Sequence, residues 1–154
     1  MLNIAFVCTG NICRSVMAEE YLKKRIGDLQ KQTDIKVFSC GIKALDGEEA
    51  TQKTKQSMKK YGLDIQSHQA VNIKNINIDN MDYIICMTKA HKDKIISLYP
   101  KVCKKIFILK ELVSKEKYAD IDNPWGHSIN VYEKAAKEIV ENVDKLIERI
   151  LKEV

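Results

Sequence analysis

The chain has 154 residues, the usual size of a single domain, and at that length it can bury a core without disulfides or a structural metal. Its 45% hydrophobic and 31% charged residues, with only 6 Gly and 2 Pro, exclude fibrous and low-complexity proteins. The net charge of +5 comes from lysines that are interleaved with acids and lack neighbouring aromatic residues, so we expect no nucleic-acid partner.

Apolar residues switch repeatedly between strand-like and helix-like spacing along the chain. Short, nearly continuous apolar runs indicate strands covered on both faces, and intervals of three and four indicate helices packed on them. In chain order the prediction is strand 2–7, helix 16–26, strand 35–39, helix 47–61, strand 81–87, helix 88–98, strand 106–109 and helix 132–150. Gly62 is expected to end the second helix and Thr88 to cap the third, and residues 111–129 are predicted to form a loop.

This alternation of strands and helices predicts an α/β fold. We expect one domain over residues 1–154, built as a doubly wound, four-stranded parallel sheet with helices on both faces in a Rossmann-like three-layer arrangement. Ligands of such sheets bind beyond the carboxyl ends of the strands. The first strand ends at Cys8, so the predicted fold places a thiol where the active site is expected.

The N-terminal segment, the lengths of the apolar stretches and the cysteines together predict the compartment. The N-terminus has no basic leader segment, and no stretch approaches the about 18 apolar residues of a membrane span, so we expect a cytoplasmic protein without a membrane partner. The five cysteines are an odd number, which indicates reduced thiols. Cys86 and Cys103 are expected in the core and His91 on the surface. The Cys8–Cys13 spacing does not suit zinc, and we expect neither metal nor cofactor.

The segment from Val7 to Ser15 reads V-C-T-G-N-I-C-R-S and runs from the first strand through a loop into a helix. Backbone N–H groups of such a loop point inward and bind an anion, helped by the partial positive charge of the helix N-terminus. It is not a nucleotide-binding loop, because the Gly-Lys-Ser/Thr ending is absent. Instead, Cys8 opens the loop and Arg14 closes it, with five residues between them.

This spacing suits phosphoryl transfer. A thiol among N–H donors and beside a guanidinium is favoured as the thiolate, and the same donors match the three equatorial oxygens of a phosphoryl group. Arg14 can bind two of these oxygens at once, and the Ser15 hydroxyl can donate a hydrogen bond to the Cys8 sulfur. The alternative interpretation is a buried cysteine at a strand end, followed by a surface arginine.

At these residues the chain resembles the low-molecular-weight protein tyrosine phosphatases, whose signature near the N-terminus is C-[TL]-G-N-x-C-R-S-P. Three later stretches resemble that family as well, namely F-S-C-G-I-K-A-L-D-G-E-E-A, G-L-D-I-Q-S-H-Q-A and D-Y-I-I-C-M-T. The resemblance therefore covers essentially the whole chain. It implies the four-stranded parallel α/β fold of the family.

The resemblance also implies a role for each residue of the loop. Cys8 would be the nucleophile and Arg14 the clamp on the phosphate. The phosphate-binding loop would consist of Thr9, Gly10, Asn11, Ile12, Cys13, Arg14 and Ser15. The residues whose hydrogen bonds hold this loop in shape would be Asn11, Ser15, Ser39 and His68.

Two positions depart from the family pattern. The proline that follows Cys-Arg-Ser is Val16 here, which the first turn of a helix tolerates. The family's general acid is an aspartate directly before a proline, and in D-I-D-N-P-W-G that position is Asn123, whose amide cannot give up a proton. We expect Asp122 to take over as the acid, with Asp120 as the less favoured substitute and an impaired acid step as the remaining alternative.

Three further side chains are candidates for roles at the pocket. Ile12 and Trp125 are predicted to form apolar walls for a flat aromatic ring, the alternative for Trp125 being a loop anchor packed on the core. Cys13 is predicted to form a reversible disulfide with Cys8 that protects the nucleophile from irreversible oxidation. The alternative for Cys13 is a small packed residue.

The predicted function is hydrolysis of phosphotyrosine in proteins, through a phosphocysteine on Cys8 and with release of inorganic phosphate. One alternative is phosphoarginine hydrolysis, which relatives with threonine at the position of Ile12 perform. Another is thioredoxin-coupled arsenate reduction, which uses the same fold and loop but needs two further cysteines close together. A phosphate-binding module without activity is the third, and Asn123 is the residue that favours it.

Overall fold

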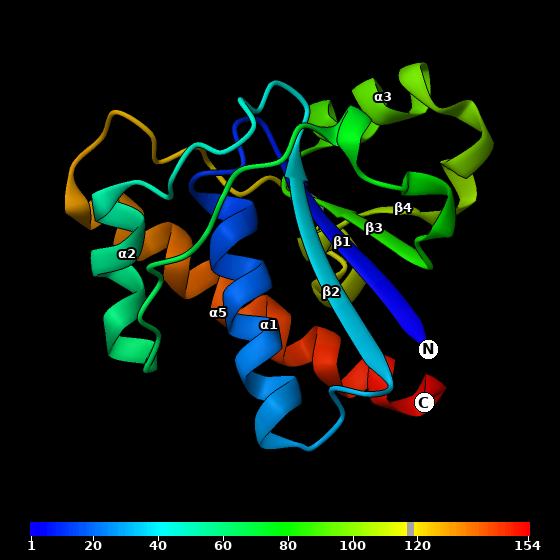
Figure 1. The fold of residues 1–154 in the computed structure, drawn as a ribbon, viewed down its shortest axis with the longest axis horizontal. Helices are drawn as coiled ribbons and strands as arrows, with labels where there is room; N and C mark the ends of the chain where they lie inside the picture. The colour runs from blue at the N-terminus through cyan, green and yellow to red at the C-terminus, as the bar shows by residue number, and fades with distance from the viewer. Residues whose placement is uncertain (117–118) are drawn as a thin grey trace.

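The computed structural model describes residues 1–116 and 119–154. At its centre is a sheet of four parallel strands in the order β2-β1-β3-β4 (Figure 1). The strands are β1 Leu2–Cys8, β2 Ile35–Gly41, β3 Tyr83–Cys86 and β4 Ile106–Ile108. Each of them falls on a predicted strand, because a strand buried on both faces leaves a continuous apolar run in the sequence.

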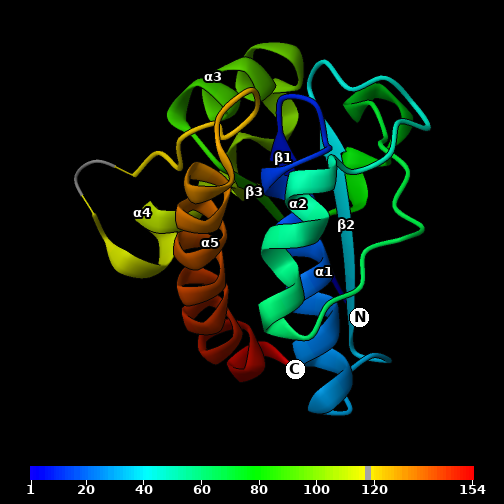
Figure 2. The ribbon, with the colours of Figure 1, turned by 90° about the vertical axis from the view of Figure 1, so that its left-hand side faces the viewer.

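Helices cover both faces of this sheet. They are α1 Arg14–Asp28, α2 Gln52–Met58, α3 Lys89–Leu98, α4 Leu109–Ser114 and α5 Ile129–Ile150. Figure 2 shows α1, α2 and α5 side by side on one face, and Figure 1 shows α3 beyond the other face. This three-layer arrangement confirms the predicted α/β fold class. Within the described residues, no helix is both long and apolar enough to cross a membrane.

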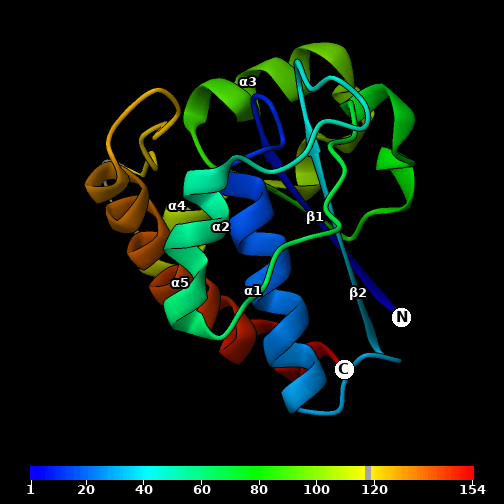
Figure 3. The ribbon, with the colours of Figure 1, turned by 60° about the vertical axis from the view of Figure 1, so that its left-hand side comes forward.

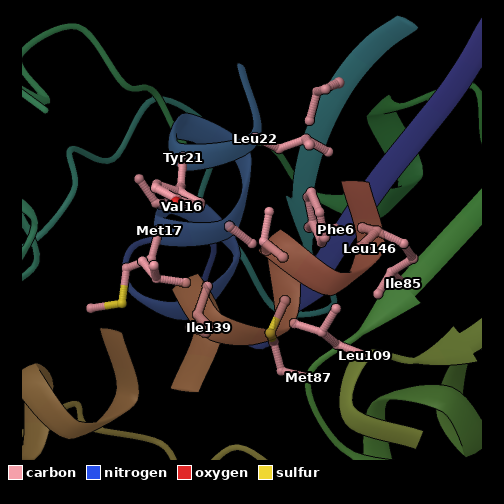
Figure 4. Packing of buried hydrophobic residues seen from close by; sticks show 14 of the residues in the cluster. Phe6, Val16, Met17, Tyr21, Leu22, Ile85, Met87, Leu109, Ile139 and Leu146 are labelled. Carbon is pink, nitrogen blue, oxygen red and sulfur yellow. The ribbon is translucent and has the colours of Figure 1, made fainter. Parts of the chain in front are cut away.

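The alternation of side chains along β1 builds a core on each face of the sheet. Ile4, Phe6 and Cys8 belong to the larger core, between the sheet and helices α1 and α5. Ala5 and Val7 belong to the smaller core on the α3 side. Figure 4 shows the larger core from close by, with apolar side chains of β1, β3, α1 and α5 packed together. Strand β1 is therefore held from both sides up to its last residue.

Two connections differ from their predictions. The helix expected over 47–61 is an α-helix only in α2, because Gly47 adopts a φ of 88° at a turn and residues 48–51 are irregular. The loop expected from residue 111 begins with the last four residues of α4. Gly62, left-handed with a φ of 78°, ends a 3-10 turn over Lys59–Tyr61 that continues α2, and the Thr88 side chain caps α3 as predicted by accepting a hydrogen bond from the His91 N–H.

The carboxyl end of β1 lies where the strand order reverses, since β2 and β3 are on opposite sides of β1. Sheets of this kind bind ligands at that point. Figure 3 shows two loops at this end of the molecule, the dark blue loop that follows β1 and the orange loop that precedes α5. The fold thus brings residues around position 10 and around position 123 to the same end of the sheet.

Candidate active site

The loop between β1 and α1 has a strained backbone at Asn11, whose φ of 55° lies in the left-handed region. The buried Asn11 side chain donates to the hydroxyls of Ser15 and Ser39, both at 2.8 Å, and accepts from the Val71 N–H at 2.9 Å. His68 Nε2 donates to the Asn11 carbonyl at 2.7 Å. Strain of this kind persists only where the surroundings over-determine it, and these four contacts do so.

The four predicted support residues are therefore brought together, and a fifth residue extends their network. Ser39 Oγ donates to Glu19 Oε1 at 2.6 Å, and His68 Nδ1 lies 3.8 Å from the same oxygen. Glu19 is buried on α1, one helical turn after Ser15. Sequence reasoning missed Glu19, although its spacing of four from Ser15 places both on the same helix face. Its carboxylate orients the Ser39 hydroxyl, so that Ser39 accepts from Asn11.

Cys8 lies at the base of the loop, with its sulfur 2.9 Å from Ser15 Oγ. Because Ser15 Oγ already accepts from Asn11, its own hydrogen is available for the sulfur. Helix α1 begins at Arg14 without a side-chain cap and without an acidic residue in its first turn. Its first N–H groups and the positive end of its dipole therefore favour an anion in the loop.

Gly41, the last residue of β2, supports the loop from the side. A Cβ atom at this position would lie 2.5 Å from the Thr9 carbonyl oxygen and 2.8 Å from the Asn11 nitrogen. The two residues that follow donate backbone hydrogen bonds to the loop, Ile42 to the Cys8 carbonyl at 3.0 Å and Lys43 to the Thr9 carbonyl at 2.9 Å. Only glycine permits this close approach of two backbones.

Arg14 is buried, with 3% of its surface exposed. Its Nη1 donates to the Ile121 carbonyl at 2.8 Å, and its buried Nε has no hydrogen-bond partner among the described residues. Burial lowers the pKa of Arg14, and the neighbouring Cys8 and Cys13 act in the opposite direction. Because the pKa of an arginine lies far above neutral pH, Arg14 remains protonated. Its guanidinium is therefore fixed at one end and has an N–H group to offer to an oxyanion.

A cavity of about 200 Å³ opens above the thiol, and we call it the thiol cavity. It is lined by Cys8, Thr9, Gly10, Ile12, Cys13, Arg14, Asn123 and Trp125. Ile12 and Trp125 thus lie where the predicted apolar walls should be. The Trp125 side chain is 62% exposed, so the alternative of a loop anchor packed on the core is wrong.

The segment before α5 places the candidate acids away from the expected position. Asn123 lines the thiol cavity, and its Oδ1 accepts from the Trp125 N–H at 3.2 Å. Asp120 accepts from the backbone N–H of Lys89 at 2.8 Å, at the start of α3. Asp122 is exposed and borders a neighbouring cavity of about 370 Å³ beside α5. Asp122 does not line the thiol cavity in this structure, and its role as the acid stays a prediction.

His91 is buried, and the prediction that it is exposed is wrong. Its Nε2 lies 2.9 Å from Thr9 Oγ1, and its Nδ1 has no partner among the described residues. Burial lowers the pKa of His91 to about 4, and the charge of Arg14 adds to this effect. A neutral imidazole on α3 therefore supports the first residue of the phosphate loop.

The thiols of Cys8 and Cys13 both border the thiol cavity, and both are free. Cys13 Sγ lies 3.5 Å from the Tyr132 hydroxyl and 3.7 Å from Thr51 Oγ1. Burial, together with the hydrogen bond to Cys13, raises the pKa of Tyr132 to about 12. The Tyr132 hydroxyl thus keeps its hydrogen and packs against Cys13 as a neutral group.

The other cysteines do not form a relay with Cys8. Cys103 is exposed, so its predicted place in the core is wrong, whereas Cys86 is fully buried as predicted. Cys40 and Cys86 flank Val7 from strands on either side of β1, in the core on the opposite face from Cys8. Two strand spacings amount to about 9.5 Å, beyond the reach of a disulfide. This arrangement disfavours the arsenate-reductase alternative.

One group of metal-ligating type occurs in the described part of the chain. The ligand atoms of Glu19, Glu20 and His68 lie within 4.8 Å of one another, beside a cavity of about 530 Å³. The Glu19 carboxylate already binds Ser39 and, at 2.9 Å, Lys23. Burial raises the pKa of Glu20, and the charge of Glu19 adds to the shift. The group is thus engaged with the network behind the phosphate loop.

A thiol at a strand end, within reach of a buried guanidinium and a helix N-terminus, defines a cysteine-dependent phosphoryl-transfer site on a parallel α/β sheet. The chain belongs to the low molecular weight phosphotyrosine protein phosphatase family, whose model matches residues 3–154. Thiol and arginine are separated by five residues because a loop of this length can close a ring of N–H donors around one anion.

Proteins similar to this chain have two kinds of name. A low molecular weight protein-tyrosine-phosphatase of Staphylococcus epidermidis is 34% identical over 146 residues, covering 94% of this chain and 96% of the relative. The structure of an arginine phosphatase from Geobacillus stearothermophilus has a TM-score of 0.89 at 35% identity, covering 99% of this chain and 95% of that one. A mutant arginine phosphatase with a phosphorylated active-site serine has a TM-score of 0.91 at 28% identity, covering 98% and 97%.

Proposed function

We propose that this protein hydrolyses phosphotyrosine in proteins, with residues 1–154 acting as a single phosphatase domain. The observation that carries the proposal is the position of the Cys8 sulfur, which is 2.9 Å from Ser15 Oγ and borders the same cavity as Arg14. A thiol nucleophile, a ring of N–H donors and a buried guanidinium are the parts that phosphoryl transfer to sulfur requires.

The proposed reaction has two steps. Cys8 attacks phosphorus opposite the leaving oxygen, so that an S–P bond forms while the P–O bond to tyrosine breaks. Water then attacks the phosphocysteine, inorganic phosphate leaves and the thiolate returns. Arg14 binds two phosphoryl oxygens throughout, the loop amides bind the phosphoryl group as well, and the residues around Asn11 keep the loop in shape. The scheme uses no cofactor.

Two observations support this substrate and this intermediate. Ile12 and Trp125 offer apolar contact to an aromatic ring, whereas isoleucine has no group that could hydrogen-bond a guanidinium. The names of relatives include both tyrosine and arginine phosphatases, and Ile12 favours tyrosine between them. In one of the relatives an active-site serine carries a phosphoryl group, which supports a phosphorylated enzyme at the position of Cys8.

The partners we propose are a phosphotyrosine-containing protein and the product, inorganic phosphate, in the cytoplasm. The free cysteines support a reducing compartment. Surface lysines such as Lys23, Lys24 and Lys89 pair with acids one turn away, which supports a solvated surface without nucleic-acid or membrane partners.

Replacement of the nucleophile tests the proposal. Cys8→Ser is expected to abolish turnover of a phosphotyrosine peptide while vanadate binding stays measurable by calorimetry, because the loop amides and Arg14 make the anion site. The exposed Cys103→Ser is the matched control and is expected to keep full activity. Activity of the Cys8 variant within tenfold of the parent would remove Cys8 from this role.

Replacement of a wall residue tests the substrate. Two peptides that differ only in phosphotyrosine or phosphoarginine are compared by kcat/KM, and the parent is expected to prefer phosphotyrosine. Ile12→Thr is expected to reduce or reverse that preference, because it opens the wall and adds a hydroxyl. Ile96→Thr, half-buried on α3, is the control. A parent that already favours phosphoarginine would contradict the proposed role of Ile12.

A further inference from the structure

The thiol cavity contains a nucleophile and an anion site, but its described lining residues lack the carboxyl group that the family pattern uses as the general acid. None of the described residues that line it carries a carboxyl group or an imidazole. At the position of the family's acid the lining has Asn123, whose Oδ1 accepts from the Trp125 N–H. Its free amide hydrogens can donate a hydrogen bond, but an amide does not release a proton near neutral pH.

The neighbouring carboxyl and imidazole groups lie outside the lining of the thiol cavity. The Asp120 carboxylate accepts from the first N–H of α3, and Asp122 borders the neighbouring cavity beside α5. The charges of both carboxylates act on Arg14, but neither residue lines the thiol cavity. His91 lies behind Thr9, with Nε2 against the Thr9 hydroxyl. Burial, followed by the charge of Arg14, lowers the pKa of His91 to about 4, so that the ring holds no second proton at neutral pH. In this arrangement a leaving group departs without help from the described part of the protein.

We propose that this site transfers phosphoryl groups without a general acid and that it therefore acts on phosphohistidine, in addition to the phosphotyrosine of the proposed function, on whose phosphocysteine step this inference rests. An unassisted leaving group must be a weak base. The ordinary pKa is about 6.5 for the imidazole of histidine, about 10 for the phenol of tyrosine and above about 12 for the guanidinium of arginine. Among phosphorylated ring-bearing side chains, histidine therefore suits this site best.

The bond changes balance without an external acid. Phosphohistidine that is protonated on its second ring nitrogen is attacked by the Cys8 thiolate, so that the S–P bond forms and the P–N bond breaks. The electron pair of the P–N bond stays on nitrogen, and histidine leaves as neutral imidazole. Water then displaces sulfur from phosphorus, the electron pair returns to sulfur and one water proton passes to a phosphate oxygen.

The walls of the cavity are compatible with this substrate. Ile12 and Trp125 offer contact to a flat ring, and the ring that leaves is positively charged before transfer. A cation over the face of a tryptophan is attracted by the ring quadrupole. Phosphoarginine is also cationic, but its leaving group is a much stronger base. The aromatic wall and the missing acid together thus favour phosphohistidine over both phosphotyrosine and phosphoarginine as the substrate.

The test compares kcat/KM, which reports the first phosphoryl transfer, for two peptides that differ only in phosphohistidine or phosphotyrosine. The parent is expected to favour phosphohistidine by at least tenfold. Asn123→Asp supplies the missing acid and is expected to raise kcat/KM for phosphotyrosine by about 10²–10⁴-fold, with less than a few-fold change for phosphohistidine. Asn130→Asp makes the same change at an exposed position of α5 and is expected to alter neither value.

Each remaining outcome decides between the two proposals. Vanadate binding confirms that every variant keeps its anion site, and Cys8→Ser must abolish both activities; if it does not, the proposed function fails. Equal parent values for both peptides, together with no gain in Asn123→Asp, would overturn the phosphohistidine inference alone. A selective loss of phosphotyrosine turnover in Asp122→Asn would identify Asp122 as the acid and would likewise overturn it.

Discussion

The guanidinium of Arg14 owes its position to burial and to one backbone contact, the hydrogen bond to Ile121. Arg14→Lys keeps the charge but removes the planar fork, so we expect kcat/KM to fall by about 10²–10³-fold. Arg25→Lys is the matched control, because Arg25 pairs with Asp144 on the surface at 2.6 Å. Steady-state kinetics with p-nitrophenyl phosphate measures both, and a loss below tenfold for Arg14 would mean that it does not hold the phosphate.

The two thiols that border the thiol cavity lead to a redox prediction. Mild peroxide is expected to convert Cys8 and Cys13 into a disulfide that added thiol reverses, with recovery of activity. In Cys13→Ala the nucleophile has no partner, so the same treatment is expected to give irreversible loss and sulfinic or sulfonic Cys8 in the mass spectrum. Overoxidised Cys8 as the main product of the parent would contradict this prediction.

At the residue scale, the sequence predicts those residues whose chemistry is local. Cys8 and Arg14 follow from the loop pattern, because strand, loop and helix are consecutive in the chain. Glu19 and His91 do not, since a charged or polar residue in a helix is usually exposed and their burial depends on contacts with distant segments. Asn123 was recognised as a departure, but only the structure shows that Asp122 borders another cavity.

At the scale of elements, the contact between β2 and the phosphate loop depends on Gly41. A Cβ in Gly41→Ala would meet two backbone groups of the loop, which cannot rotate away, so we expect vanadate affinity and kcat/KM to fall at least tenfold. Gly27→Ala is the control, because no atom lies within 4 Å of its Cβ and alanine in α1 is expected to stabilise by about 0.4–1 kcal/mol. Unchanged vanadate affinity in Gly41→Ala would show that the loop adapts.

A helix or strand can be predicted from the sequence where the spacing of its own apolar residues determines its type. The four strands and α5 have apolar patterns that follow from burial on known faces. Residues 47–51 are predicted as helix but form an irregular segment, because their conformation depends on long-range backbone bonds: Gly47 donates to Ala70 at 2.8 Å, and Thr51 donates to Ile12 at 3.1 Å. Such pairings join residues that are far apart in the chain, and local spacing contains no signal for them.

At the scale of the whole molecule, His91 makes stability depend on pH. Its pKa is about 6.5 when unfolded and about 4 when folded, because burial and Arg14 disfavour the proton. Between these two values the unfolded chain binds more protons than the folded one. The contribution of neutral His91 to the free energy of unfolding, roughly 3 kcal/mol, is therefore complete above pH 6.5 and is lost as the pH falls to about 4. Denaturant unfolding at several pH values measures the free energy of unfolding, which is expected to change less with pH in His91→Asn than in the parent. An equal change in both proteins would contradict this prediction.

The contacts that fix Asn11 come from residues 28, 57 and 60 positions further along the chain. The anion site is therefore present only when β2 and the segment around residues 68–71 have packed against the loop, and a phosphate ion distinguishes folded from unfolded molecules. By mass action, any oxyanion at 100 times its dissociation constant adds about 2.7 kcal/mol to the free energy of unfolding. The product of the proposed reaction is such an ion, so a cell rich in phosphate lengthens the life of the folded enzyme while it slows its turnover.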